Sequence, residues 1–199
     1  MTHQFHPATP QPLASTILVL TGGALGVGAS IVRQAHAAGA HVFFGDVLDD
    51  AGAALARELT TNTSSASSNG PTVHYQHCDV TSYSSTLSLF DAAYKAFGRV
   101  DHAIANAGIG EQGNIFDEGL TLESVREAPE KAMAVVDVNL KGEIYFARIA
   151  SVYLRQGEGG RDKSLTLVSS VAGFREDPGL FVYVPSKHGV LGLMRVLRE

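Results

Sequence analysis

Short apolar runs that alternate with longer stretches of helical period restrict the fold of this 199-residue sequence more than any other feature. The runs predict five strands, at residues 17–20, 41–44, 73–77, 102–105 and 165–168. The stretches between them predict helices at 26–38, 50–59 and 85–97, one or two within 123–154, and one from Tyr183 onward. Strands alternating with helices imply βαβ units and therefore an α/β fold, a doubly wound, Rossmann-like parallel sheet with helices on both faces. Ligands of such sheets bind beyond the C-terminal ends of the strands.

The composition, with 45% hydrophobic and 18% charged residues, is typical of a folded protein and not of a disordered one. We expect a flexible lead-in over residues 1–16 and a single domain over 17–199. The net charge of −5 argues against nucleic acid as a partner, because phosphate binding needs a basic stripe. No run of about 18 apolar residues occurs, so no membrane span is expected. A single cysteine, Cys78, and an N-terminus unlike a secretory signal favour a cytoplasmic location.

A glycine-rich turn follows the first predicted strand, with the pattern Thr-Gly-x-x-x-Gly-x-Gly over residues 21–28. Gly22 can adopt backbone angles that other residues avoid, Gly26 lets the chain approach a pyrophosphate, and Gly28 lets the helix approach the sheet. Free N–H groups at the helix N-terminus favour phosphate, and Leu25 is also expected at the cofactor. Tight packing alone is the alternative explanation of these glycines.

A carboxylate at the end of the second strand indicates which dinucleotide is bound. Asp46 can accept hydrogen bonds from the adenosine ribose hydroxyls and would repel a 2′-phosphate. Neither Val47 nor the glycine-rich turn supplies an Arg or Lys for such a phosphate, so NAD is favoured over NADP. The alternative is that Asp46 is a turn residue or a helix cap. His77 and Cys78 should point to opposite faces of their strand, so no metal site is expected.

Two side chains of the last predicted helix can act together in acid–base chemistry. Tyr183 and Lys187 are four residues apart and share a helix face, so the phenol and the ammonium can flank one point. A free tyrosine has a pKa of about 10, and a nearby ammonium favours the phenolate, which is the form that accepts a proton. Pro185 falls in the first turn, where helices tolerate proline. A solvated surface pair is the alternative, because this spacing is common on helices.

Taken in order, these motifs resemble those of the short-chain dehydrogenase/reductase family. The resemblance rests on the glycine-rich turn, on Asn106-Ala107-Gly108 after the fourth strand, on Tyr183-x-x-x-Lys187, and on Ser170, thirteen residues before Tyr183. It covers the chain from Ile17 onward. The resemblance implies an enzyme that transfers a hydride between a nicotinamide dinucleotide and an alcohol or ketone substrate.

The resemblance also assigns residues to the cofactor. Asp79 and Val80, which follow the third strand, would contact the adenine ring. The backbone of Asn106, Ala107 and Gly108 would lie against the cofactor, with the Asn106 side chain bracing the sheet.

The same resemblance assigns the chemical roles. Ser170 would donate a hydrogen bond to the substrate oxygen, Tyr183 would exchange the proton, and Lys187 would bond the nicotinamide ribose. Asn139 would hold a water molecule in the proton relay, with local packing as its alternative role. Ser169 is one residue off the family spacing and, by strand alternation, lies on the opposite face, so Ser170 is the predicted serine.

The chain ends inside the helix of Tyr183, whereas members of the family usually continue with further strands and a substrate loop. We therefore expect either a shortened form of an active enzyme or a short relative that binds the nucleotide with little or no turnover. Our hypothesis is an enzymatic lineage in which this chain is impaired. A methyltransferase would explain the glycine-rich turn and Asp46, but not Ser170, Tyr183 and Lys187 together.

Largely apolar side chains are expected to line the entrance of the predicted site, and they suggest a bulky, apolar alcohol or ketone as the substrate. On one side we expect Phe174, Arg175, Phe181 and Val182, and on the other Ile109, Ile115 and Phe116. By resemblance, subunits would pair through the helices at roughly 137–156 and 183–199, giving a homodimer or a homotetramer.

Overall fold

The computed structural model describes residues 13–62, 70–157 and 162–198, so residues 1–12 of the predicted lead-in lie outside the described residues. One sheet has the strand order β3-β2-β1-β4-β5. Its members are β1 (Ile17–Thr21), β2 (His41–Asp46), β3 (Val73–His77), β4 (His102–Ala105) and β5 (Ser164–Leu167). Each pair of neighbouring strands is parallel. The predicted α/β fold with a parallel sheet is therefore confirmed.

β1 lies at the centre of the sheet, and all five of its residues are buried. It pairs with β2 on one side and with β4 on the other, so the strand order reverses between β1 and β4. In doubly wound sheets such a reversal leaves a crevice beyond the C-terminal strand ends. The position of the predicted site therefore follows from the order of the strands.

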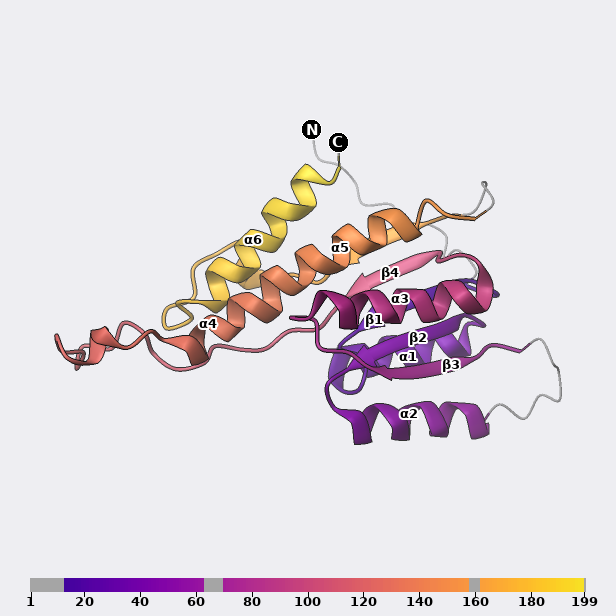
Figure 1. Cartoon of the computed structure of the whole chain (residues 1–199), viewed down its shortest axis with the longest axis horizontal. Helices are drawn as coiled ribbons and strands as arrows, with labels where there is room; N and C mark the ends of the chain where they lie inside the picture. The colour runs from indigo at the N-terminus through magenta and orange to yellow at the C-terminus, as the bar shows by residue number, and fades with distance from the viewer. Residues whose placement is uncertain (1–12, 63–69, 158–161, 199) are drawn as a thin grey trace.

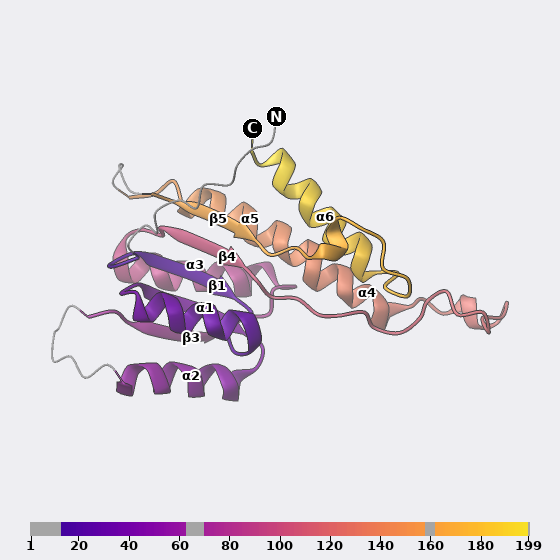
Figure 2. The same cartoon turned by 180° about the vertical axis from the view of Figure 1, so that it is seen from behind.

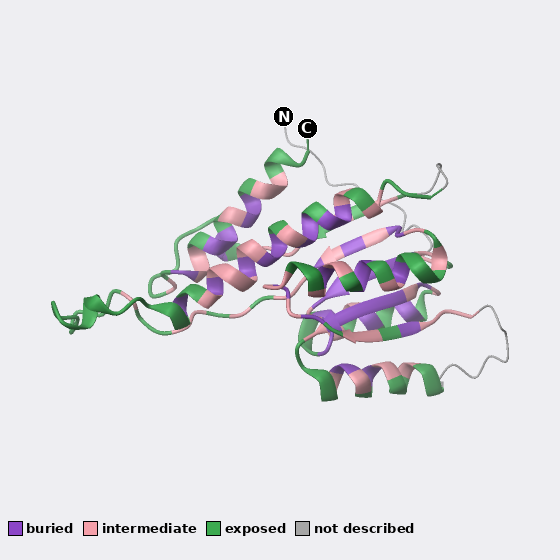
Figure 3. Cartoon of the chain, viewed as in Figure 1, coloured by how far each residue is buried: buried purple, intermediate pink, exposed green. Residues whose placement is uncertain are grey.

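Helices cover both faces of the sheet (Figures 1 and 2). α1 (Gly26–Ala37) and α2 (Asp49–Asn62) cover one face, and α3 (Tyr83–Phe97) and α5 (Gly142–Tyr153) cover the other. Each side has its own apolar core, one around Phe44 and the other around Phe90 and Phe146. Figure 3 shows the buried residues along the central strands and on the helix sides that face them.

The stretch 123–154 forms a nearly continuous helical segment in its second half. A short 3-10 helix at Ser124–Arg126 precedes α4 (Glu130–Val136), which continues through a π-helical turn (Asp137–Lys141) into α5. Residues 116–131 are all exposed, and this segment extends away from the body of the molecule (Figures 1 and 2). π-Helical turns within α-helices often occur at functional sites.

The last helix, α6 (Tyr183–Val196), starts at the predicted residue. Its N-terminal part packs on α4, where Val182 joins a small apolar cluster with Ala132 and Val135. Among the described residues, none of the helices combines the length and the hydrophobicity that crossing a membrane would require.

Candidate functional site

Two hollows lie beyond the C-terminal ends of the strands. The first has a volume of about 560 Å³ and is lined by the glycine-rich turn, Asp46 and the segments that follow β3 and β4. The second, of about 410 Å³, is lined by the segment after β4, the end of β5 and the start of α6. Asn106, Gly108 and Ile109 line both, so the two hollows adjoin. Their volumes suit small-molecule ligands.

The glycine-rich turn packs directly on the start of the segment after β4. Gly22 has a φ of +70°, and a Cβ there would lie 2.6 Å from the Ala107 Cα. A Cβ on Gly28 would lie 1.9 Å from the Gly22 carbonyl oxygen, to which the Asn106 Nδ2 donates a hydrogen bond of 2.8 Å. The bracing role that was predicted for Asn106 therefore rests on a specific hydrogen bond, to the Gly22 carbonyl oxygen. Both glycines are needed because no side chain fits between the turn and β4.

The N-terminus of α1 faces the first hollow with the features of an anion site. Its N-cap residue, Leu25, makes no side-chain capping bond, and the first turn contains no acidic residue. Apart from its chain neighbours and its own helix backbone, Gly26 has no heavy atom of the described residues within 4 Å of the position that a Cβ would occupy. Leu25 and Gly28 line the hollow. Free N–H groups with open space in front of them fit the phosphates of a dinucleotide.

Asp46 lies at the end of β2 and lines the first hollow. Its Oδ2 accepts a hydrogen bond from the Ala24 N–H at 3.0 Å, and its Oδ1 accepts one from the Leu48 N–H at 3.1 Å. The carboxylate therefore connects the glycine-rich turn with the start of α2, as the turn interpretation expected. Each oxygen keeps a second lone pair that a ribose hydroxyl could use, so ribose binding stays a prediction.

Asp79 and Val80 lie after β3 and line the first hollow. The Asp79 Oδ1 accepts hydrogen bonds from the N–H and the hydroxyl of Thr81, at 2.9 and 2.8 Å. His77 is paired with Asp49, with 2.9 Å between Nδ1 and Oδ1, while Cys78 is buried. No group of three or more potential metal-ligating side chains occurs in the described parts of the chain.

Tyr183 and Lys187 line the second hollow together. The Lys187 Nζ lies 6.0 Å from the centroid of the Tyr183 ring and donates a hydrogen bond of 2.9 Å to the Val168 carbonyl oxygen. Lys187 is buried, with 4% of its surface exposed. A buried ammonium acts more strongly on its neighbours than a solvated one, because water screens it less.

The two serines after β5 have different partners. The Ser170 Oγ accepts a hydrogen bond of 3.2 Å from the Ala172 N–H and caps a 3-10 helix at Val171–Gly173. The Ser169 Oγ donates one of 3.0 Å to the Lys187 carbonyl oxygen, and Ser169 is the serine among the residues that line the second hollow. Ser170 therefore stays a prediction based on the family spacing.

Asn139 is buried in the π-helical turn, and its amide binds the backbone of Ile109. Its Nδ2 donates to the Ile109 carbonyl oxygen and its Oδ1 accepts from the Ile109 N–H, both at 2.8 Å. The Nδ2 also donates to the Ser186 Oγ at 3.4 Å. These contacts support the packing role of this side chain, and a role in a proton relay stays a prediction.

Two acidic residues at the site were not predicted from the sequence. Glu111, in the segment after β4, accepts hydrogen bonds from the backbone N–H groups of Val182 and Tyr183, at 3.1 and 2.7 Å. Glu143, in the first turn of α5, lies 3.6 Å from the Lys187 Nζ. No feature of the sequence indicates that Glu111 belongs to the site. Glu143 could have been found, because it shares the inward helix face with Asn139 and Phe146, where a charged residue is unexpected.

The two groups of side chains that were expected on either side of the substrate are in contact with each other. Ile109, Ile115 and Tyr183 pack against the apolar cluster that contains Val182, and the rings of Phe116 and Phe181 are in edge-to-face contact at 5.0 Å. Val182, which was expected to face the substrate, is instead buried in this cluster. Phe116, Phe174 and Phe181 remain exposed.

Comparisons with known proteins agree with this architecture. The family model for short chain dehydrogenases matches residues 16–199. Short-chain dehydrogenase/reductase prx4 of Penicillium roqueforti is 33% identical over 188 residues, which cover 94% of this chain and 50% of that protein. The 3-alpha-(or 20-beta)-hydroxysteroid dehydrogenase of Mycobacterium bovis is 34% identical over 183 residues, covering 92% of this chain and 62% of that protein.

A solved structure has the same fold. The crystal structure of a short chain dehydrogenase/reductase from Burkholderia phymatum, in complex with NAD, matches with a TM-score of 0.80 at 23% identity, over 94% of this chain and 60% of that chain. The protein therefore belongs to the short-chain dehydrogenase/reductase family of oxidoreductases, and the predicted membership is confirmed. The chain spans about half the length of the first curated relatives that it matches.

We predict that Glu111 stabilises the start of α6. Glu111→Ala removes a carboxylate from the N-terminal N–H groups of the helix, so the free energy of unfolding should fall by about 1–2 kcal/mol. Glu118→Ala, which removes an exposed carboxylate from the same segment, is the control and should change it by less than about 0.5 kcal/mol. Urea unfolding of the three proteins measures the difference. Equal losses in both variants would contradict the capping role.

Proposed function

We propose that this protein transfers a hydride between NAD(H) and a secondary alcohol or ketone. The observation that carries the proposal is the juxtaposition of the two hollows. One is built around a glycine-rich turn at a helix N-terminus, and the other contains Tyr183 and Lys187. A nucleotide in the first and a substrate in the second would meet at Asn106, Gly108 and Ile109. An acid–base pair beside such a junction suits alcohol–ketone chemistry.

The first hollow has the groups that a nicotinamide dinucleotide requires. Gly22, Gly26 and the N–H groups at Leu25 and Gly28 would hold the pyrophosphate, and Asp46 would bind the adenosine ribose. Val80 adds an apolar surface for the adenine. A second negative charge from a 2′-phosphate would lie close to the Asp46 carboxylate, which supports NAD over NADP.

The residues of the second hollow would handle the proton. When bound, the cofactor supplies or accepts the hydride. Tyr183, as phenolate, would take the proton of the alcohol, and as phenol would return it to a carbonyl oxygen. The Lys187 ammonium would stabilise the phenolate, and Ser170 would donate a hydrogen bond to the substrate oxygen. Asn139 would keep the segment after β4 in register with the start of α6 through Ile109.

The proposed substrate is a bulky, apolar metabolite. Phe116, Phe174 and Phe181 leave aromatic surface exposed, and Phe181 is next in the chain to Leu180, which lines the second hollow. Burying such surface against an apolar substrate would stabilise the complex, whereas a small polyol would bury little of it. The hydroxysteroid dehydrogenase among the relatives carries a name that agrees with this size and polarity.

We predict that Tyr183→Phe keeps NADH binding but lowers the rate of hydride transfer by about 100- to 10,000-fold, because the proton acceptor is lost. Tyr94→Phe, which removes a partly exposed hydroxyl from α3, is the matched control and should leave both unchanged. NADH fluorescence measures the cofactor affinity, and a panel of steroid alcohols and ketones measures the rate. In the wild type, NADPH should bind more weakly than NADH.

Equal rates in wild type and Tyr183→Phe would refute the assigned base. NADH binding without transfer in the wild type would favour a nucleotide-binding protein without turnover.

A second prediction separates the two serines. Ser170→Ala should reduce the rate of hydride transfer by about 100- to 1,000-fold without weakening NADH binding, as expected when a donor to a developing oxyanion is lost. Ser169→Ala should mainly lower the free energy of unfolding, by about 1 kcal/mol, because it loses the hydrogen bond to Lys187. The reverse pattern would assign the substrate contact to Ser169.

We extend the proposal to a homodimer or homotetramer formed through α5 and α6. Ile144 and Val152 on α5, and Val196 and Leu197 at the end of α6, are large apolar side chains that are exposed in the single chain. A symmetric pair would bury them against their copies. Analytical ultracentrifugation at micromolar concentration should show a dimer or a tetramer. A protein that sediments only as a monomer would contradict this part of the proposal.

A further inference from the structure

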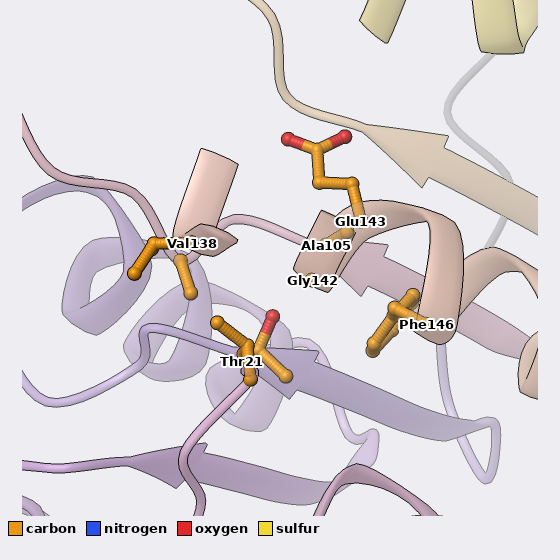
Figure 4. Close-up of a pocket in the computed structure, with 8 residues that line it drawn as sticks. Thr21, Ala105, Val138, Gly142, Glu143 and Phe146 are labelled. Atoms are coloured by element: carbon orange, nitrogen blue, oxygen red, sulfur yellow. The ribbon is translucent and has the colours of Figure 1, made fainter. Parts of the chain in front are cut away.

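Glu143 is a buried carboxyl that the proposed chemistry does not use. Its exposed fraction is 2%, and neither carboxyl oxygen has a hydrogen-bond partner within the described ranges. It lines a narrow void that leaves no room for a water-sized sphere. Figure 4 shows the carboxylate directed away from Thr21, Val138 and Phe146. A buried polar group without hydrogen bonds costs free energy, so its presence here calls for an explanation.

Lys187 is the charged group that contacts this carboxyl. The distance between its Nζ and the Glu143 Oε1 is 3.6 Å, and 5% and 2% of the two side chains are exposed. On its other sides the Nζ donates to the Val168 carbonyl oxygen and lies 6.0 Å from the centroid of the Tyr183 ring. Glu143, Lys187 and Tyr183 therefore form a chain of three ionisable groups that runs from the interior to the second hollow.

The other elements packed around Glu143 present uncharged side chains. Around the void, on the side from which the carboxylate points away, these are Thr21, Val80, Ala105, Ala107, Val138 and Phe146. The titratable groups between α3 and α5 contact each other: Tyr83 packs on Tyr145, and Asp91 accepts a hydrogen bond from Tyr153. On β4, His102 is hydrogen-bonded to Ser164. Lys187 is thus the charged side chain that compensates a Glu143 carboxylate in the described structure.

Burial controls the protonation of Glu143. It raises the pKa of the carboxyl to about 8, while the Lys187 ammonium acts in the opposite direction. Near neutral pH the carboxyl is mostly protonated, and the ammonium charge is uncompensated. As the pH rises through about 8, the carboxylate forms and the buried pair becomes neutral overall.

We propose that Glu143 is a positioning residue for Lys187, and that its carboxyl, by losing or keeping a proton, sets how strongly the Lys187 ammonium stabilises the phenolate of Tyr183. This inference rests on the proposed function. The sign follows from the charges, because a Glu143 carboxylate next to the ammonium weakens the positive potential at Tyr183. Ionisation of Glu143 therefore reduces the advantage that Lys187 gives to the base.

Glu143→Gln tests the proposal because it keeps the size of the side chain and removes its titration. At about pH 6.5 the variant and the wild type should transfer hydride at similar rates, since position 143 is neutral in both. At about pH 9.5 the variant should be faster by about tenfold, because its ammonium stays uncompensated. The ratio of the two rates cancels the titration of groups that both proteins share. A ratio that stays constant or falls as the pH rises overturns the proposal, and a purely structural role predicts a constant ratio.

Asp137→Asn is the matched control. Asp137 is a half-exposed carboxylate of the π-helical turn next to α5, and it is paired with Lys141 at 2.5 Å instead of with Lys187. Its removal takes away one negative charge, as Glu143→Gln does once the pH is above about 8, but leaves the Lys187 pair intact. The rate ratio of Asp137→Asn to wild type should not vary with pH. A rise equal to that of Glu143→Gln would show a general charge effect and would overturn the proposal.

Difference infrared spectroscopy tests the coupling without cofactor or substrate. The carbonyl stretch of a protonated carboxylic acid that is missing in Glu143→Gln belongs to Glu143, and in the wild type it should disappear as the pH rises through about 8. In Lys187→Met the signal should persist to higher pH, because the ammonium no longer favours the carboxylate. An unchanged midpoint in Lys187→Met overturns the proposal. Failure of the proposed hydride transfer would leave this spectroscopic coupling intact, so the two failures can be told apart.

Discussion

The amide of Asn139 is hydrogen-bonded to both backbone groups of Ile109, and both hollows depend on this interaction. Ile109 belongs to the segment after β4, which lines the first hollow and the second. Two further contacts hold the same segment. Asn106 binds the glycine-rich turn through the Gly22 carbonyl oxygen, and Glu111 binds the N-terminus of α6. An irregular segment has no strand or helix partners of its own, so these side chains supply the hydrogen bonds that keep it in place.

This arrangement explains how one short segment can line two hollows. The close approach of Gly22 and Gly28 to the end of β4 fixes the nucleotide side, where any Cβ would collide with backbone atoms. The contact of Glu111 with α6 fixes the position from which Tyr183 starts its helix. Because the same residues carry both contacts, a change on one side should be transmitted to the other. The hydrogen bonds of this segment therefore connect the geometry of the first hollow with that of the second.

A second feature of the site is a buried pair of ionisable side chains. Lys187 and Glu143 are both buried, and the reduced solvent screening there strengthens the interaction between them. A pair of this kind adds little to stability compared with well-packed apolar residues. In the proposed hydride-transfer site the pair would act through its field at Tyr183, a role that stability alone does not supply.

Much of the fold could be predicted because its signals are local. Apolar runs marked each strand, and Tyr183 marked the start of α6. Where boundaries differ, the cause is a contact that the pattern does not contain. β2 extends to Asp46 because Gly45 and Asp46 pair with β3, and α3 starts earlier than expected because Ser82 caps it by accepting from the Ser85 N–H. Helix was expected from residue 123, but α4 starts only at Glu130, because the exposed segment 116–131 buries too little to stabilise a longer helix.

The sequence by itself determined the order of strands and helices, and with it the placement of the glycine-rich turn, Asp46, Asn106 and Tyr183 at the carboxyl edge of one parallel sheet. This was possible because periodicity and turn chemistry depend on near neighbours in the chain. Only the tertiary structure decided that Glu111 caps α6, that Ser169 faces Lys187, and that Glu143 lies behind the ammonium. These partners are distant in the chain, and their burial and direction arise from the packing of helices against a sheet, which no local pattern encodes.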